Sequence, residues 1–319
     1  MHPIFSGFPV GLAKAAMKLF PSHPTFEEYL GNETFRHPTY IASDNSRRKE
    51  IRRKAAKFRY DFEYAIPFQK YFNSNLDAYF RGRKVLDLGC MTGGRAVAWA
   101  EKYQIAEISG IDVSQEYIDA ASEFAREKGI NAKFWVDFGE KISTEDGSFD
   151  TIVTYDVLEH VRDPDRVFGE CHRVLKPGGH LIAVFPSFYQ PLEHHLTLVT
   201  RTPGLQWLFP RDLLMRAYVG ILDERGQESW WYARKSPVRE PWEALDQVNG
   251  LTYAAALNIM DARRWSIKEE SYPGLFLSGR RAQQSAIFRT LQKMTSQLAK
   301  LPLLREVCAD RLALIAEKR

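Results

Sequence analysis

The chain of 319 residues has little cysteine: three in all, Cys90, Cys171 and Cys308, spaced far apart. An odd number of scattered cysteines excludes a disulfide framework, and their spacing offers no structural zinc site. Because no cluster of carboxylates demands a divalent cation, no metal is predicted. We therefore expect a reduced, cytoplasmic protein.

Long apolar runs and a charge excess of one sign are also missing. No uncharged apolar run reaches the roughly 18–20 residues that cross a bilayer, and no basic-then-apolar secretory pattern opens the chain. The 44 Lys and Arg against 40 Asp and Glu leave a formal charge of +4. This surplus is too small to indicate nucleic-acid binding by itself. Any electrostatic argument therefore has to be local.

The remaining composition is that of an ordinary globular protein, with 45% hydrophobic and 26% charged residues. It excludes collagen-like and wholly disordered chains. Between residues 84 and 186, short apolar runs alternate with stretches of helical periodicity. Strands are predicted at 85–88, 108–111, 133–136, 151–154 and 180–185, and helices at 95–102, 115–128 and 164–175. Such alternation predicts a parallel sheet with helices on both faces.

The regions on either side have a different texture. Residues 1–83 are aromatic and basic without strand periodicity, which predicts a helical N-terminal extension or cap. Residues 84–319 are predicted to form the main domain, with insertions at about 188–250, which we interpret as a lid, and at 274–306. A helix near 252–264, a strand near 265–270, helical structure over 280–300 and a last strand near 311–316 would complete the sheet.

Two amphipathic stretches lie in the extension. Residues 8–20 indicate a docking helix, the alternative being a membrane anchor. A second helix, ended by Pro67, is predicted from an apolar stripe at Ile51, Ala55, Phe58, Phe62 and Ala65. Around that stripe lie eight cations, Arg47, Arg48, Lys49, Arg52, Arg53, Lys54, Lys57 and Arg59. They form either a solvated outer face or a contact for an anionic substrate, RNA or lipid headgroups.

Residues 85–94 read V-L-D-L-G-C-M-T-G-G, the pattern of a buried strand, a glycine turn and a helix start. Such a turn brings a ligand close to the backbone and aims unpaired N–H groups at it, which predicts a nucleoside-like cofactor. In dinucleotide-binding turns a central glycine leaves room for a pyrophosphate, and here that position is Met91. The carboxylate of Asp87 would repel phosphate yet help to hold an ammonium or sulfonium. Both features favour S-adenosylmethionine over NAD or FAD.

Two further acids come at predicted strand ends. Asp112 is placed to accept hydrogen bonds from ribose hydroxyls, the alternative being a cap for the helix near Ser114. Asp137 is placed to accept from an adenine amine while Phe138 covers the base, the alternative being an ordinary loop acid.

The ordered motifs over residues 84–186 resemble those of class I S-adenosylmethionine-dependent methyltransferases, particularly the group similar to methyltransferase domain 11. The motifs are the 85–94 turn, G-I-D at 110–112, D-F at 137–138, F-D at 149–150 leading to D-V-L-E-H-V at 156–161, and V-L-K-P-G-G at 174–179. The resemblance implies a doubly wound, seven-stranded, mostly parallel Rossmann-like sheet with an antiparallel last strand. K-P-G-G at 176–179 is interpreted as a structural turn before the fifth strand, and Glu159 and His160 as residues that shape the site.

The same resemblance implies a set of cofactor contacts: Asp87, Gly89, Cys90, Met91, Gly93, Asp112, Val113, Asp137, Phe138 and Tyr155. Met91 departs from the family, because most members carry glycine there. The departure is expected to crowd the methionine portion of the cofactor.

The segment after the fifth strand, P-S-F-Y-Q-P-L-E-H-H, suggests the acceptor side of the site. Histidine titrates near neutral pH and suits removal of a hydroxyl proton. We therefore predict His194 or His195 as general base, oriented by Glu193; loop packing or a metal contact is the alternative. The expected reaction is O-methylation of a small-molecule or glycan hydroxyl, with amine, carbon and carboxylate acceptors left open.

Two other functions are compatible with the sequence. An RNA-modifying methyltransferase would use the basic helix as its electrostatic footprint. A catalytically silent binding protein would fail to bind S-adenosylmethionine, an outcome that Met91 makes conceivable.

Overall fold

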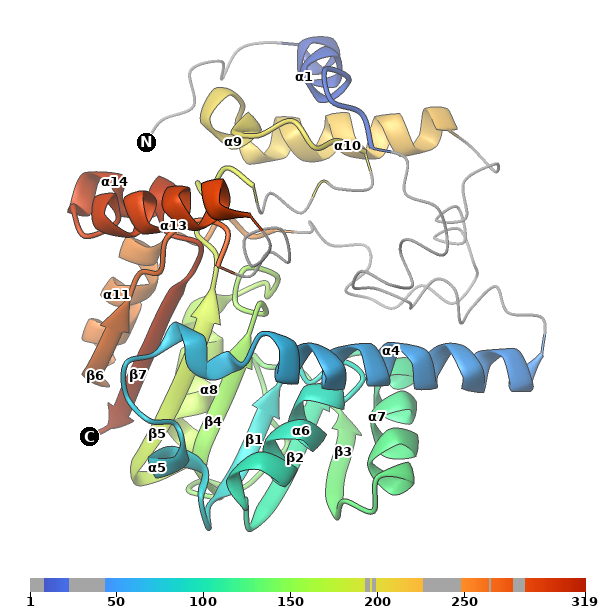
Figure 1. Cartoon of the computed structure of the whole chain (residues 1–319), viewed down its shortest axis with the longest axis vertical. Helices are drawn as coiled ribbons and strands as arrows, with labels where there is room; N and C mark the ends of the chain where they lie inside the picture. The colour runs from blue at the N-terminus through green and yellow to red at the C-terminus, as the bar shows by residue number, and fades with distance from the viewer. Residues whose placement is uncertain are drawn as a thin grey trace.

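The computed structural model describes residues 9–22, 44–192, 196, 199–225, 248–263, 265–277 and 285–319. At its centre is one sheet with the strand order β3-β2-β1-β4-β5-β7-β6 (Figure 1). The strands are β1 Lys84–Leu88, β2 Glu107–Asp112, β3 Ala132–Val136, β4 Phe149–Tyr155, β5 Leu175–Phe185, β6 Trp265–Ser271 and β7 Leu312–Lys318. The predicted seven-stranded doubly wound sheet is confirmed.

The first five strands pair in parallel, and β7 runs antiparallel to both of its neighbours, β5 and β6. One prediction was wrong in detail. Residues 176–179 do not precede the fifth strand but lie within β5. There the register jumps, since Phe149 pairs with Leu175 and Thr151 with His180. Gly178, with φ of 72°, takes the left-handed conformation that this irregularity requires.

Helices cover both faces of the sheet. Helices α8 (Pro164–Val174) and α11 (Tyr253–Ala262) bury their apolar sides in the largest core cluster, together with β1, β4, β5 and β7. Helices α6 (Gly94–Tyr103) and α7 (Gln115–Glu127) lie on the other face. On α8 the buried residues Val167, Phe168, Cys171 and Val174 follow helical spacing, which is the pattern that predicted the helix.

The N-terminal extension is part of this core. The 3₁₀ helix η1 (Phe68–Tyr71) and the short helix α5 (Asp77–Phe80) place Phe68, Leu76 and Phe80 among the buried side chains of β1, β5 and α6. Phe80 stacks on Trp99 of α6 with the ring centroids 5.8 Å apart. Residues before and after position 83 therefore share one hydrophobic core.

Helix α4 (Asn45–Ala65) lies directly on α6 and α7. A Cβ atom on Gly94 would come within 2.0 Å of the carbonyl oxygen of Ala56, so the absence of a side chain at Gly94 allows this close approach. The predicted apolar stripe is only partly right. Ile51 and Ala55 are buried, whereas Ala65 is exposed and Glu63 is fully buried.

Basic residues of α4 form ion pairs with a neighbouring helix, which neither sequence interpretation included. Arg52 forms ion pairs of 2.8–3.1 Å with three acids of α7, which are Glu116, Asp119 and Glu123. Arg53 forms a bidentate pair with Glu127 of the same helix. Cations of α4 thus dock the helix onto the acidic side of α7.

The insertions form two further layers. Helices α9 (Leu205–Leu208) and α10 (Arg211–Arg225) follow β5, and α1 (Val10–Met17) packs on α10 through Ala13 and Met17. This confirms the docking helix predicted near the N-terminus. Between β6 and β7 lie α13 (Ala286–Leu298) and α14 (Pro302–Cys308). Among the described helices, none is long and apolar enough to cross a membrane.

The ion pairs of Arg52 lead to a stability prediction. The Arg52 side chain is 15% exposed, so Arg52→Ala would leave three acids facing one another in a partly dry contact. We expect the free energy of unfolding, measured by urea titration, to fall by about 2 kcal/mol. Arg53→Ala is the matched control, because its pair is largely exposed and should change stability by less than about 1 kcal/mol. Equal losses for the two variants would contradict the docking function of Arg52.

Candidate functional site

The carboxyl ends of parallel strands lie at the same edge of a sheet, and several predicted cofactor contacts lie at this edge. Asp87 in β1, Asp112 at the end of β2 and Tyr155 at the end of β4 lie on neighbouring strands. Asp87 and Asp112 are buried, at 5% and 9% exposure. The structure therefore brings together three of the predicted cofactor contacts.

The glycine turn after β1 folds back over β2. The backbone N–H groups of Gly89 and Cys90 both donate to the carbonyl oxygen of Ile111, at 2.8 and 2.9 Å. Gly89 and Gly93 have φ of 77° and 67°, values that favour glycine. The turn is thereby held against the adjacent strand at the point where α6 begins.

Met91 also lies in the left-handed region, with φ of 48°. This conformation accounts for the glycine that most family members carry, since a side chain is disfavoured there. Its side chain packs against Ile51, Ala55, Tyr117 and Ala120, a cluster shared by α4 and α7. The methionine therefore stabilises the docked α4 helix while its backbone keeps the glycine-like geometry.

Asp112 connects the turn to α7. One carboxylate oxygen accepts from the N–H of Met91 at 3.1 Å, and the other accepts from the N–H of Ser114 at 3.0 Å. Ser114 is the N-cap of α7, so the alternative interpretation, a cap for this helix, describes part of the environment of Asp112. The contact of Asp112 with ribose hydroxyls stays a prediction.

Asp137 has a structural function that the sequence did not indicate. Its carboxylate accepts from the indole of Trp135, from the N–H of Phe138, and from both the N–H and the hydroxyl of Ser143. Three of these donors reach Oδ2 and one reaches Oδ1, so the carboxylate is already engaged within the protein, and its adenine contact stays a prediction. Phe138 is 45% exposed, an arrangement suited to covering a flat ring.

Burial dominates the electrostatics of Asp87. Desolvation raises the pKa of its carboxyl to about 7, the positive charge of Arg95 opposes this increase, and Asp112 adds to it. A cation entering the site would favour the ionised carboxylate. Asp87 is thus a potential partner for the positively charged end of a ligand.

A buried polar cluster beneath this edge was missed by sequence reasoning. Arg311 of the β7 approach pairs with both carboxylate oxygens of Asp156, at 2.7 and 2.9 Å. The guanidinium of Arg95 lies 3.8 Å from the ring centroid of Tyr155, and the hydroxyl of Tyr155 is 2.9 Å from that of Tyr71. Burial raises the pKa of Tyr155 to about 12, so its hydroxyl stays protonated at neutral pH.

Asp156 is also conformationally unusual, because its φ of 54° is rare for a residue with a side chain. Such strain persists where the surroundings enforce it, often near functional sites. The bidentate pair with Arg311 supplies that enforcement. Asp156 opens the D-V-L-E-H-V motif, but its partner is 155 residues away in the chain, so no local signal could have identified the pair.

Polar atoms without partners test whether a cofactor fits. Within the described part of the chain, the buried hydroxyls of Thr92 and Ser114 have no hydrogen-bond partner. Both flank Asp112, one in the glycine turn and the other at the start of α7. Buried hydroxyls are normally paired, so these atoms are consistent with a polar ligand at this position. Their position next to Asp112 fits a ribose-bearing cofactor.

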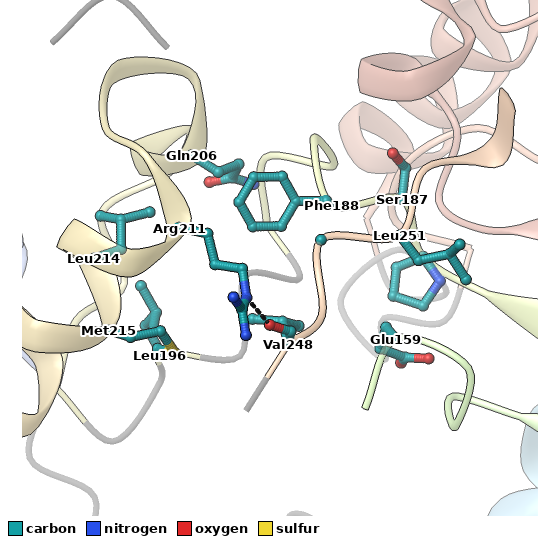
Figure 2. A pocket seen from close by; sticks show the side chains of 12 residues that line it. Glu159, Ser187, Phe188, Leu196, Gln206, Arg211, Leu214, Met215, Val248 and Leu251 are labelled. Carbon is teal, nitrogen blue, oxygen red and sulfur yellow. Dashed lines mark hydrogen bonds between the residues drawn. The ribbon is translucent and has the colours of Figure 1, made fainter. Parts of the chain in front are cut away.

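A small pocket lies beyond the end of β5 (Figure 2). Its walls come from the β4–α8 loop, the β5 exit, α9 and α10, and the 248–251 segment. The lining residues are Glu159, Pro186, Ser187, Phe188, Leu196, Gln206, Arg211, Leu214, Met215, Val248, Gly250 and Leu251. Most are apolar, with a few polar groups at the margins, as in sites for small organic molecules.

The predicted catalytic residues Glu193, His194 and His195 lie outside the described residues. The structure instead places Glu159, which the sequence suggested as a shaping residue, in the wall of the pocket. In Figure 2, Arg211 reaches across the middle of the view and donates to the carbonyl oxygen of Val248.

A seven-stranded sheet with an antiparallel β7, a glycine turn after β1 and an acid at the tip of β2 defines the class I, S-adenosylmethionine-dependent methyltransferase fold. In agreement, residues 85–179 match the family model described as a methyltransferase domain. Residues 85–179 of the chain are therefore a methyltransferase domain.

Relatives of known name share this segment. The chain is 29% identical over 188 residues to a ubiquinone biosynthesis O-methyltransferase of Methylococcus capsulatus, covering 55% of this chain and 76% of that protein. A protein of the same name from Coxiella burnetii is 35% identical over 101 residues, which are 32% of this chain but only 42% of the relative. A solved S-adenosylmethionine-dependent methyltransferase from Mesorhizobium loti is 17% identical, with a TM-score of 0.47, and covers 75% of this chain and 92% of its own.

The raised pKa of Asp87 gives a prediction for stability against pH. The folded protein binds this proton more tightly than the unfolded chain does, so Asp87 lowers stability as the pH rises from about 4 to about 7. Asp87→Asn removes the titration. We expect the variant to gain about 2 kcal/mol more in unfolding free energy at pH 8 than at pH 5, measured by urea titration without ligand. A gain that does not change with pH would contradict the buried, titrating carboxyl.

Proposed function

We propose that this protein transfers a methyl group from S-adenosylmethionine to a hydroxyl of a small, largely apolar molecule. The observation that carries the proposal is the apolar pocket beyond the end of β5, at the same edge of the sheet as the acid-bearing tips of β1 and β2. Its apolar lining favours an organic acceptor, and its wall contains one buried carboxylate, Glu159. The named relatives are O-methyltransferases, which supports oxygen as the acceptor atom.

Residues of the glycine turn and of the neighbouring strand tips would hold the cofactor. Asp112 accepts from the ribose hydroxyls, and the turn from Gly89 to Gly93 presents backbone to the amino-acid portion, with Cys90, Met91 and Val113 around it. Phe138 covers the base beside Asp137, and Tyr155 closes the inner end of the site. When bound, S-adenosylmethionine supplies a methyl group activated by a sulfonium. Asp87 contributes negative charge close to that positive ligand.

Proton removal from the acceptor has two candidate sources. The imidazoles of His194 and His195, with Glu193, are the bases proposed from the sequence. Glu159 is the carboxylate that the structure supplies at the pocket wall. A base within reach of the acceptor hydroxyl increases its nucleophilicity as the new bond forms.

The RNA-modifying alternative loses its main support. Its footprint was the basic helix, and two of those cations, Arg52 and Arg53, pair with acids of α7. Arg47, Lys54 and Lys57 pair with acids of α4 itself. The positive charge that the sequence concentrates on α4 is thus largely balanced within the fold.

Filling the pocket tests the position of the acceptor. Met215→Trp adds bulk to the wall that α10 contributes, so we expect the KM for an acceptor found by screening hydroxyl compounds with labelled cofactor to rise at least tenfold. The dissociation constant of S-adenosylhomocysteine should stay unchanged. Val219→Trp, four residues along the same helix at a 44% exposed position, is the matched control and should alter neither value. An unaltered KM in folded Met215→Trp would place the acceptor elsewhere.

A second set of variants separates the two candidate bases. Loss of the general base should lower kcat by about 100-fold or more without weakening S-adenosylhomocysteine binding. We expect this loss in the double variant His194→Ala/His195→Ala, and a smaller effect of Glu159→Gln, measured as kcat against pH. If the double variant keeps full turnover and Glu159→Gln loses it, the carboxylate is the base.

A further inference from the structure

Helix α13 has its apolar side facing outward. Ile287, Leu291, Met294 and Leu298 recur at the spacing of one helical stripe and are exposed, Ile287 at 71% and Met294 at 58%. Leu301, the N-cap of α14, is exposed as well. Leu303, in the first turn of α14, extends this face and is 89% exposed. We call these six residues the α13 face.

The side of α13 that contacts the protein is the more polar one. Gln292, Thr295 and Ser296 are half-buried, and Gly274 lies against the helix backbone, where a Cβ atom would come 2.1 Å from the carbonyl oxygen of Gln292. A surface helix ordinarily buries its apolar stripe and exposes its polar side. The reversed orientation of α13 therefore leaves a continuous apolar surface for a partner.

The charges around the α13 face have one sign. Residues 286–305 contain four cations, Arg289, Lys293, Lys300 and Arg305, and no Asp or Glu. A second copy of this chain, related by a two-fold axis through the face, would bring these cations against their own copies. The exposed cations next to the apolar stripe, Arg289, Lys293 and Lys300, instead match the surface of a bilayer with anionic headgroups, whereas Arg305 lies over the ring of Tyr272.

We propose that the α13 face binds the surface of an anionic lipid bilayer, with α13 lying in the plane of the interface. The site of chemistry is at the same end of the sheet (Figure 1). Glu306 of α14 accepts from the hydroxyl of Ser187, which lines the acceptor pocket, and from the N–H groups of Tyr253 and Ala254 at 3.1 and 3.0 Å. The bound helices would thus hold the rim of the pocket beside the lipid.

Sedimentation of the full chain with vesicles tests this proposal without depending on methyl transfer. The wild type should pellet with vesicles of phosphatidylcholine and phosphatidylglycerol, and much less with phosphatidylcholine alone. The triple variant Ile287→Ser/Met294→Ser/Leu298→Ser should lose at least tenfold in partitioning. Because these side chains are exposed, its thermal unfolding should match the wild type. Tyr64→Ser, a 48% exposed aromatic on α4, is the control that should pellet normally.

The cations provide an independent arm. Lys293→Gln and Lys300→Gln should each weaken partitioning about fivefold at low salt, and added salt should reduce this difference. A wild-type chain that stays in the supernatant with anionic vesicles overturns the proposal, as does a triple variant that pellets like the wild type. If ultracentrifugation shows a dimer that the triple variant abolishes, while vesicles bind neither protein, a second copy occupies the face and the proposal is also overturned.

Discussion

The turn after β1 depends on one set of hydrogen bonds, those that fix it to the end of β2. Two backbone N–H groups donate to the carbonyl oxygen of Ile111, and the N–H of Met91 donates to the carboxylate of Asp112. These contacts set the position of the first turn of α6 and leave Gly94 free to receive the backbone of α4. The cofactor side of the site, the docking of α4 and the placement of α7 all follow from this arrangement.

The second constraint on the fold is the burial of charged side chains near the site. Asp87, Asp156 and Glu63 are carboxylates beneath or beside the carboxyl edge, and Arg95 and Arg311 are the cations placed among them. A buried charge without a partner is costly, so such a set stays stable only when every member is held in place. The strained backbone of Asp156 and its bidentate partner illustrate how the fold meets this requirement.

The positions of the predicted cofactor contacts on the sheet followed from the sequence because their signals are local. The glycine turn, Asp112 and Phe138 each follow an apolar strand directly, and parallel strands necessarily bring such positions to one edge. The basic helix shows the opposite case. Periodicity identified α4, but its acidic partners are on α7, 64 to 74 residues later. Charge counting alone therefore suggested a solvated face or an anion contact, where the fold supplies ion-pair partners.

The acceptor half depends on contacts between distant segments. The pocket is lined by residues of the β4–α8 loop, of α10 and of the 248–251 segment. The outward orientation of the apolar side of α13 follows from the contact of its backbone with Gly274, which the sequence does not indicate.

The sequence by itself determined the parallel strands with the helices between them, the position of the glycine turn and the acid at the tip of β2, because each is encoded within a few neighbouring residues. Only the tertiary structure decided which charges are paired, that Asp137 is already engaged, and which side of α13 meets solvent. Those properties depend on packing between residues that are far apart in the chain. Local sequence patterns carry no information about which distant residues come into contact.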